Sequence, residues 1–342
     1  MRFSLSLLVS SLAIAGVSPA LAFDPQHLQQ LYATGQCPDC DLQEAEIRGL
    51  NAQNVDLTGA NLTDAIIVDS SLVGADFSRA ALVGITFQDV DLGRSQFFQT
   101  RLRDAVFVGV NFAGASFRES WLRGANLVEA DWSQVTIKQL VLREADLMGA
   151  NLTGLDLSGS QFNEADLSRA NLVGASAIRA NFQGAILDGV GAANVNFTGA
   201  SFQDAQIQRA DFYGANLSAV NSDRADWQGS ILSVSNLRGS SFRGAIARGV
   251  NLQGAIATAS DWTGADLSGG SVYRVNFGAS VLRSLDLEGV DARQANFGGA
   301  QLADADFSFA NVTRAYFFGA NLEGATFEGT VGRELARFMG ER

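Results

Sequence analysis

The chain has almost none of the residues that most catalytic and metal sites require. Among 342 residues there are one histidine (His27), one lysine (Lys138) and two cysteines (Cys37 and Cys40). A single histidine excludes His-based metal triads and most Ser-His-Asp arrangements, and zinc would need four ligands. Lys138 does not belong to a G-x-x-x-x-G-K-[ST] phosphate loop. The sequence therefore predicts no catalytic residue, no metal site and no cofactor.

Proline is also scarce, at 3 residues, and no apolar run after residue 22 is long enough to cross a bilayer. The first 22 residues differ from the rest. Met1-Arg2 gives a short positive start, Phe3 to Val17 is apolar with small polar breaks, and Ala20-Leu21-Ala22 offers an A-x-A cleavage site. Because this stretch is too short and too often interrupted by serine for a spanning helix, it predicts a secretory signal peptide over residues 1–22.

Positive charge is sparse throughout the chain. There are 24 Lys and Arg against 36 Asp and Glu, for a formal net charge of −12. Arg2 is the only charged residue among the first 22, so an exported chain keeps 36 acidic and 23 basic side chains, a net charge of −13. This charge keeps an elongated protein soluble and argues against nucleic acid or anionic lipid as a general partner.

What the chain does have is a strict period of five. A large apolar residue recurs at nearly every fifth position from Leu42 to Phe327 without a change of phase, which is 58 repeats. The residue two places before this centre is usually small, the residue between them is often Asp or Asn, and Gly is frequent two places after the centre. A period of five fits neither an amphipathic helix nor an alternating strand. It fits one side of a squared coil, so that four repeats close a turn of twenty residues with Asn, Asp and Gly at the bends.

Segments such as Ala60-Asn61-Leu62-Thr63-Asp64 and Ala75-Asp76-Phe77-Ser78-Arg79 resemble the A(D/N)Lxx signature of pentapeptide-repeat proteins. The resemblance covers residues 40–330, about 85% of the chain. It implies an all-β solenoid, a right-handed quadrilateral parallel β-helix. Every twentieth residue on one face is aromatic at Phe77, Phe97 and Phe117. We expect these rings to stack at the inter-strand spacing of about 4.8 Å.

A solenoid has an open edge at each end and needs caps there. Asp24-Pro25 as a start and Gly35 as a stop predict a helix over residues 24–35, within an N-terminal capping segment of residues 23–39. Apolar spacing near the C-terminus predicts a second capping helix within residues 331–342. Between the caps the repeats weaken near residues 186–195 and 219–222. We expect a local kink or a looser coil there, because Ser222 would place a hydroxyl in the apolar stack.

Cys37-Pro38-Asp39-Cys40 is the sharpest short motif in the chain. In a secreted protein a C-x-x-C pair favours a structural disulfide, here between Cys37 and Cys40. A redox-responsive pair, and a metal-bound or free pair of thiols, are the alternative interpretations.

Outward-facing positions also form columns with a twenty-residue spacing, and one of these columns consists of arginines. With three nearby side chains it makes a candidate partner-binding surface, which we call the basic patch: Arg103, Arg123, Arg143, Arg118, Lys138 and Trp121. Acidic side chains are interspersed among these residues, so a neutralised, solvated face is the alternative interpretation.

These features predict a non-enzymatic rigid rod that acts as a protein-interaction or structural scaffold. Its partner would be an unidentified protein or a polyanion, and its ends also allow end-to-end homo-oligomers. The signal peptide and the repeat style together resemble cyanobacterial proteins of the periplasm or the thylakoid lumen. An extracytoplasmic compartment, either periplasm or thylakoid lumen, is therefore the expected location.

A DNA-mimicking modulator of a type II topoisomerase is the alternative function, because some pentapeptide-repeat proteins resemble an acidic duplex. Charge counts against it. A rod of about 70 Å would have to imitate on the order of 40 phosphate charges, whereas the exported chain carries −13. An enzyme comes third, because no carboxylate pair lies outside the repeat positions.

Overall fold

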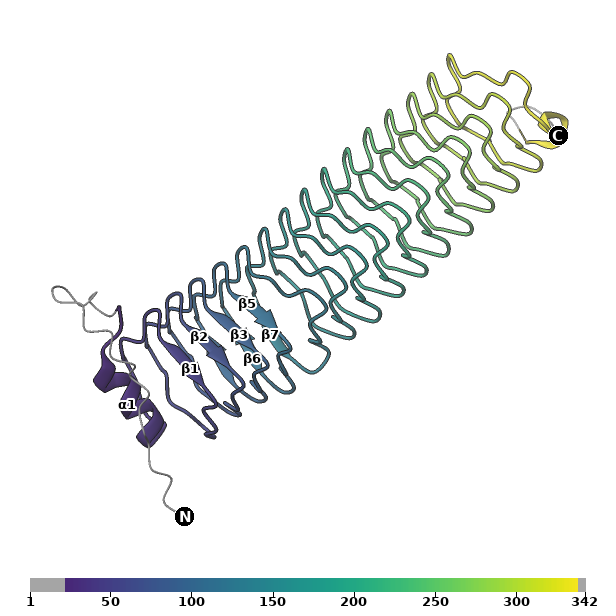
Figure 1. Ribbon diagram of the computed structural model, residues 1–342. Coiled ribbons are helices and arrows are strands. Elements are labelled where there is room, and N and C mark those ends of the chain that lie inside the picture. Colours follow the sequence, from purple (N-terminus) through teal and green to yellow (C-terminus); the bar gives the residue numbers. More distant parts are fainter. Residues whose placement is uncertain (1–21, 338–342) are drawn as a thin grey trace.

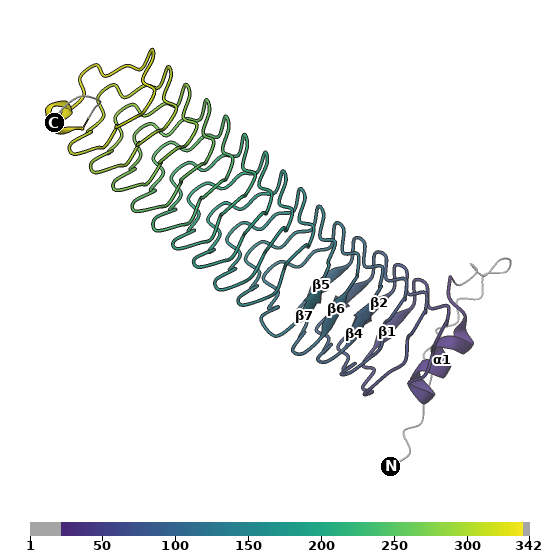
Figure 2. The same ribbon diagram turned by 180° about the vertical axis from the view of Figure 1, so that it is seen from behind.

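The computed structural model describes residues 22–337, which form a long four-sided rod with α1 at one end and η1 at the other (Figures 1 and 2). The fold class predicted from the sequence, a right-handed quadrilateral β-solenoid, is confirmed. The regular elements are α1 (Pro25–Thr34), β1 (Glu46–Arg48), β2 (Ile66–Val68), β3 (Thr86–Gln88), β4 (Gln96–Phe98), β5 (Val106–Val108), β6 (Ser116–Arg118), β7 (Thr136–Lys138) and the 3-10 helix η1 (Arg333–Leu335).

Successive twenty-residue turns, here called coils, pair in parallel with a register of twenty residues. One sheet has the order β1-β2-β3-β5 and the other β4-β6-β7. Ile47 pairs with Ile67 and Phe97 pairs with Phe117. Outside the named strands, single bridges continue this register as far as the pair Asn311 and Val331. The period of five thus becomes one side of a coil, and each repeat lies above the repeat twenty residues earlier.

The interior of the rod is filled by two side chains from each repeat, one small and one large. Phe77, Phe97 and Phe117 are buried and stack in parallel. Their ring centroids are 5.0 Å and 4.3 Å apart, with interplanar angles of 4° and 5°. The aromatic stacking predicted from the twenty-residue spacing is therefore confirmed.

The corners of the coil, two places after each centre, have a left-handed backbone, which explains why glycine is frequent there. Gly59 has φ +70° and Asp64 has φ +55°, a region that Gly adopts freely and that Asn and Asp tolerate better than most residues. The Asn or Asp before each centre closes a local turn. At Asn61, for example, the side-chain Oδ1 accepts a hydrogen bond of 3.2 Å from the backbone amide of Thr63.

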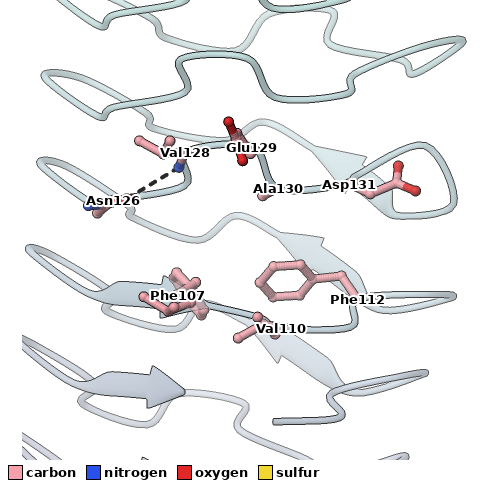
Figure 3. Close-up of a pocket in the computed structure, with 10 residues that line it drawn as sticks. Phe107, Val110, Phe112, Asn126, Val128, Glu129, Ala130 and Asp131 are labelled. Carbon is pink, nitrogen blue, oxygen red and sulfur yellow. Dashed lines mark hydrogen bonds between the residues drawn. The ribbon is translucent and has the colours of Figure 1, made fainter. Parts of the chain in front are cut away.

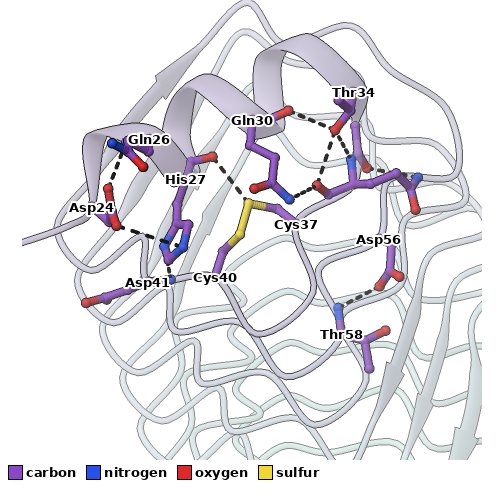
Figure 4. The surroundings of a disulfide bond; sticks show 12 residues. Asp24, Gln26, His27, Gln30, Thr34, Cys37, Cys40, Asp41, Asp56 and Thr58 are labelled. Carbon is purple, nitrogen blue, oxygen red and sulfur yellow. Dashed lines mark hydrogen bonds and ion pairs between the residues drawn. A yellow bond between two sulfur atoms is a disulfide. The ribbon is translucent and has the colours of Figure 1, made fainter.

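Helix α1 covers the open edge of the first coil (Figure 4). The Asp24 side chain caps its start by accepting from the amide of Gln26 at 2.8 Å, and Gly35 ends it with φ +68°. The only histidine has a structural contact here, since the amide of Asp41 donates to His27 Nδ1 at 3.0 Å. The Tyr32 hydroxyl both donates to the carbonyl of Arg48 and accepts from its amide. Side chains of α1 thus pair with backbone groups that have no coil beneath them.

The C-terminal end differs from the helix expected within residues 331–342. The described part, up to residue 337, contains only the three-residue η1, after which Ala336 is extended. Arg337 then pairs with the previous coil, because its amide donates to Ala315 and its carbonyl accepts from Phe317. Continuing the ladder satisfies open backbone groups that an α-helix would leave unpaired. The remainder of the expected helix lies outside the described residues.

The predicted signal peptide falls on residues 1–22, of which only Ala22 is described. Between residues 22 and 337, no helix combines the length and the hydrophobicity that a membrane crossing requires.

The expected kink near Ser222 is wrong. The ladder is intact at both weakened segments: the amide of Ser222 donates to Ser241 at 2.7 Å, and that of Gly191 donates to Ala170 at 2.9 Å. Trp227, from the next side of the same coil, donates from Nε1 to the Ser222 hydroxyl at 2.7 Å. A large neighbour therefore fills the space beside the small centre and pairs its polar group.

Candidate functional site

The structure places the three arginines of the basic patch on consecutive coils. Their backbone carbonyls accept ladder hydrogen bonds of 2.8–2.9 Å from the coil below, in the pairs Gly84–Arg103, Asp104–Arg123 and Gly124–Arg143. Trp121 lies in the same repeat as Arg123 and is 45% exposed. The other two members, Arg118 and Lys138, lie on the preceding side of the coil as partners across β6 and β7. All six residues of the patch are therefore surface neighbours within three coils.

Acidic side chains neutralise part of this patch. Arg103 pairs with Asp104 at 3.2 Å, and Arg123 pairs with Glu144 at 2.9 Å. Both pairs are well exposed, so each contributes little to stability. Among the described residues, no ion pair forms at Arg143, Arg118 or Lys138. The patch therefore keeps three uncompensated positive charges on a chain that is otherwise acidic.

A second feature was not anticipated from the sequence: the ladder breaks on one side of the rod. Each coil normally receives amide hydrogen bonds at fixed positions, such as Asp89 to Val108 at 2.8 Å and Leu92 to Asn111 at 2.9 Å. One coil later, the amides of Gly109, Phe112 and Asp131 make no backbone hydrogen bond in the described chain. At the same place, Gly114 pairs one residue out of register with Gln134.

The break continues on the next side, above the same coil. Four further ladder amides have no backbone acceptor among the described residues: Gln134, Ile137, Gln139 and Asp156. The bridge expected between residues 136 and 156 is missing as well. From the first coil to the pair of Asn311 and Val331, the ladder register is otherwise kept. The coil of residues 121–140 therefore loses its pairing with the coil below on one side of the rod and with the coil above on the next side, while its other sides stay in register.

The core opens at this break. Between residues 55 and 320, every inward-facing position is buried except Val110, Ala130 and Ile137. A hollow of about 580 Å³ lies between the two coils, within the range of about 300–1,000 Å³ that is usual for ligand pockets. We call it the inter-coil cleft (Figure 3), and it is lined by Phe107, Val108, Gly109, Val110, Phe112, Asn126, Val128, Glu129, Ala130 and Asp131.

Trp132 explains the opening. The other two tryptophans in the core have a small centre beside them on the same coil: Ser222 next to Trp227, and Ala257 next to Trp262. Trp132 has no such neighbour. Its same-coil neighbours are Leu127 and Ile137. Its ring lies against two rings of the coil below, with centroid distances of 5.4 Å to Phe112 and 4.7 Å to Phe117. A ring with no room within its own coil holds the two coils apart.

The indole nitrogens show the same contrast. Trp227 Nε1 donates to the hydroxyl of Ser222 at 2.7 Å, and Trp262 Nε1 donates to the hydroxyl of Ser260 at 2.9 Å. Trp132 is 1% exposed, yet its Nε1 has no hydrogen-bond partner. A tryptophan centre without a small same-coil neighbour was the signal in the sequence that could have located the cleft.

The lining of the cleft is negative. Glu129 and Asp131 are exposed at its rim, and none of the lining residues is basic. The backbone amide of Ser133 donates to Asp131 at 3.0 Å. This bond, with further hydrogen bonds from the Ser133 and Asn151 side chains, lowers the pKa of the Asp131 carboxyl from its usual value. Asp131 is therefore ionised at neutral pH.

The two cysteines lie beneath α1 at the entrance to the first coil (Figure 4). Both are buried, at 0% and 3% exposure, and their Cα atoms are 5.3 Å apart, with the sulfur atoms at bonding distance. No group of three or more His, Cys, Asp or Glu side chains in residues 22–337 is arranged to hold a metal ion.

The pentapeptide-repeat family model matches most of the chain. The matched segments are residues 40–79, 91–128, 121–154, 156–190, 192–221, 223–254, 248–283, 260–299 and 295–331. Among curated proteins, none matches.

The chain also matches several solved structures of pentapeptide-repeat proteins. HetL, involved in heterocyst differentiation regulation in the cyanobacterium Nostoc sp. strain PCC 7120, is 25% identical over 91% of this chain and 92% of its own, with a TM-score of 0.18. A protein from the Arabidopsis thaliana thylakoid lumen is 29% identical over 32% of this chain and 66% of its own, with a TM-score of 0.17. Full-length QnrB1, a plasmid-mediated fluoroquinolone resistance protein, is 18% identical over 66% and 94%, with a TM-score of 0.25.

Proposed function

The chain belongs to the pentapeptide-repeat family, and on that premise we propose that it is an exported, non-enzymatic scaffold that holds an acidic protein or a polyanion against its basic patch. The solenoid supplies the rigidity. Its coils repeat at about 4.8 Å, so side chains in one column keep a fixed spacing along the rod. A periodic acidic partner can match such a column without any change in the backbone.

The observation that carries this proposal is the stacking of like charges. Without partners, three arginines on consecutive coils would repel one another by about 0.9 kcal/mol per neighbouring pair, even at the dielectric constant of water. Asp104 and Glu144 relieve this repulsion at Arg103 and Arg123 only. Arg118 and Lys138 face each other across β6 and β7 in the same way. Folding alone gives no reason to gather these charges, and an acidic partner does. Trp121 adds an exposed aromatic surface of the kind enriched in binding patches.

The patch can be tested with a defined polyanion. We expect the mature protein to bind a heparin column at low salt despite its net negative charge, because Arg103, Arg123 and Arg143 concentrate positive charge locally. Changing all three to glutamine should lower the salt concentration needed for elution, because fewer counterions are then released on binding. Thermal melting should show that the triple variant folds as the parent does.

A second triple variant serves as the matched control. Arg169, Arg179 and Arg209 lie outside the patch, form no ion pair among the described residues and occupy corner positions where glutamine also occurs. Changing these three to glutamine alters the net charge by the same amount. If both variants elute at the same salt concentration, net charge alone governs binding and the patch is only a solvated surface.

Export and the cysteine pair are tested together by the intact mass of the protein from its native host. We expect cleavage after Ala22, so that Phe23 becomes the N-terminus, and a mass lower by two hydrogens for a bond between Cys37 and Cys40. The bond closes a very short loop, so its loss should affect only the nearby cap and stability only modestly. A retained Met1 would refute export, and full thiol labelling without reductant would refute the disulfide.

A further inference from the structure

We propose that the inter-coil cleft is a second binding site, which takes an extended peptide segment carrying apolar and basic side chains. The cleft is distinct from the basic patch, since none of the six patch residues lines it. The proposal therefore does not depend on the function of the patch.

Backbone groups on both sides of the cleft are available for pairing. On the lower coil these are the amides of Gly109 and Phe112, and on the upper coil the amide of Asp131. The carbonyls that would normally accept from them, at Val128, Asp131 and Val110, receive no such bond in the described chain. Unpaired backbone donors and acceptors are the groups that a bound extended peptide satisfies, with affinity coming from main-chain hydrogen bonds. Here they lie in a short break of the ladder, between the bonds of Phe107 to Asn126 and of Gly114 to Gln134.

The side chains around these groups define which peptide fits. Val110 and Ala130 are inward-facing residues that are partly exposed at the cleft. Val108 and Val128 extend its apolar lining. Apolar side chains on one face of an extended segment would cover them. Glu129 and Asp131 at the rim carry negative charge with no base in the lining, so lysine or arginine on the other face of the segment complements the site. Alternation of the two types follows from the two-residue period of a strand.

The free protein offers the first test, by hydrogen exchange resolved to single amides. The amides of Gly109, Phe112 and Asp131 should exchange much faster than their equivalents on intact coils, which are Asp89, Leu92 and Asn151. If the two sets are equally protected, the ladder is closed in solution and the proposal fails.

Peptide binding is the second test. The probe is a fluorescent eight-residue peptide of alternating lysine and valine, measured by anisotropy against two controls. One control replaces lysine by glutamate, and the other carries N-methyl groups that block backbone pairing. We expect the lysine–valine peptide to bind about tenfold or more tightly than either control and to protect the three cleft amides. Binding weaker than about 1 mM, or equal binding of the N-methylated peptide, would overturn the proposal.

Variants separate this cleft from the rest of the surface. Trp132→Leu places in this column the residue already found at Leu92 and Leu152, and it should let the coils close and abolish peptide binding. Trp262→Leu, at an intact part of the rod, is the control and should bind as the parent does. Asp131→Asn keeps the residue type of the neighbouring Asn111 and Asn151 and should weaken binding severalfold. Unchanged binding by Trp132→Leu would place the peptide elsewhere and overturn the proposal.

Discussion

Replacing Phe97 by aspartate should lower the free energy of unfolding by about 5 kcal/mol or more. The ring lies between those of Phe77 and Phe117 and is 0% exposed. Losing a buried phenylalanine side chain costs about 3–5 kcal/mol in packing, and an unpaired carboxylate in the same space adds its own desolvation cost. Inside the part of the rod that the structure describes, the buried polar residues are serines and threonines, so no base could pair with it.

Phe98→Asp is the matched control, because it makes the same substitution at the adjacent residue. Phe98 points outward from β4 and is 38% exposed, so this change should cost at most about 1 kcal/mol. Urea denaturation followed by circular dichroism compares the two variants. Similar midpoints for Phe97→Asp and Phe98→Asp would mean that the inward register of the repeat is wrong.

The periodicity made most of the fold predictable. Because every repeat has the same length, one assignment of inward and outward positions fixes all the others. Phe77, Phe97 and Phe117 are twenty residues apart, so they occupy the same position on consecutive coils and stack. The first cap was equally readable, since Asp24, Pro25 and Gly35 carry local start and stop signals that do not depend on distant contacts.

Predictions failed where the outcome depended on packing between neighbours. Ser222, a small polar residue at a position that is usually large and apolar, was expected to disturb the coil. Trp227 on the same coil instead fills the space and donates a hydrogen bond to the hydroxyl. Trp132 looked ordinary as a large apolar centre, yet it opens the rod. A rule about single positions cannot distinguish these cases, because each depends on the summed volume of the centres within one coil.

At the chain end, the described part of the predicted capping helix, residues 331–337, differs for a related reason. Spacing at Leu335, Phe338 and Met339 indicated an amphipathic helix, but the open edge of the last coil competes for the same backbone. After the short η1 the chain rejoins the ladder, with Arg337 bridging to Tyr316. Among the basic patch residues, the sequence predicted the shared column, but it did not show which arginines would be neutralised by Asp104 and Glu144.

The different environments of Trp132 and Trp227 predict stability losses of different size for the same substitution. Trp227→Leu should lower the free energy of unfolding by about 3 kcal/mol, because it leaves a cavity and removes the hydrogen bond to Ser222. Trp132→Leu also loses buried area, but it removes an unpaired indole nitrogen and lets the amides of Gly109, Phe112 and Asp131 pair. Each recovered bond contributes about 1 kcal/mol, so its net change should be close to zero.

Both variants can be compared by urea denaturation together with hydrogen exchange at the cleft. A stability difference of about 3 kcal/mol between them, with new protection of the cleft amides only in Trp132→Leu, is the expected result. Equal losses would mean that Trp132 packs as well as Trp227 does, and the cause of the broken ladder would then have to lie elsewhere in the coil of residues 121–140. The size of the difference therefore tests whether one oversized core residue, without a small neighbour to offset it, is enough to open a solenoid that is otherwise closed.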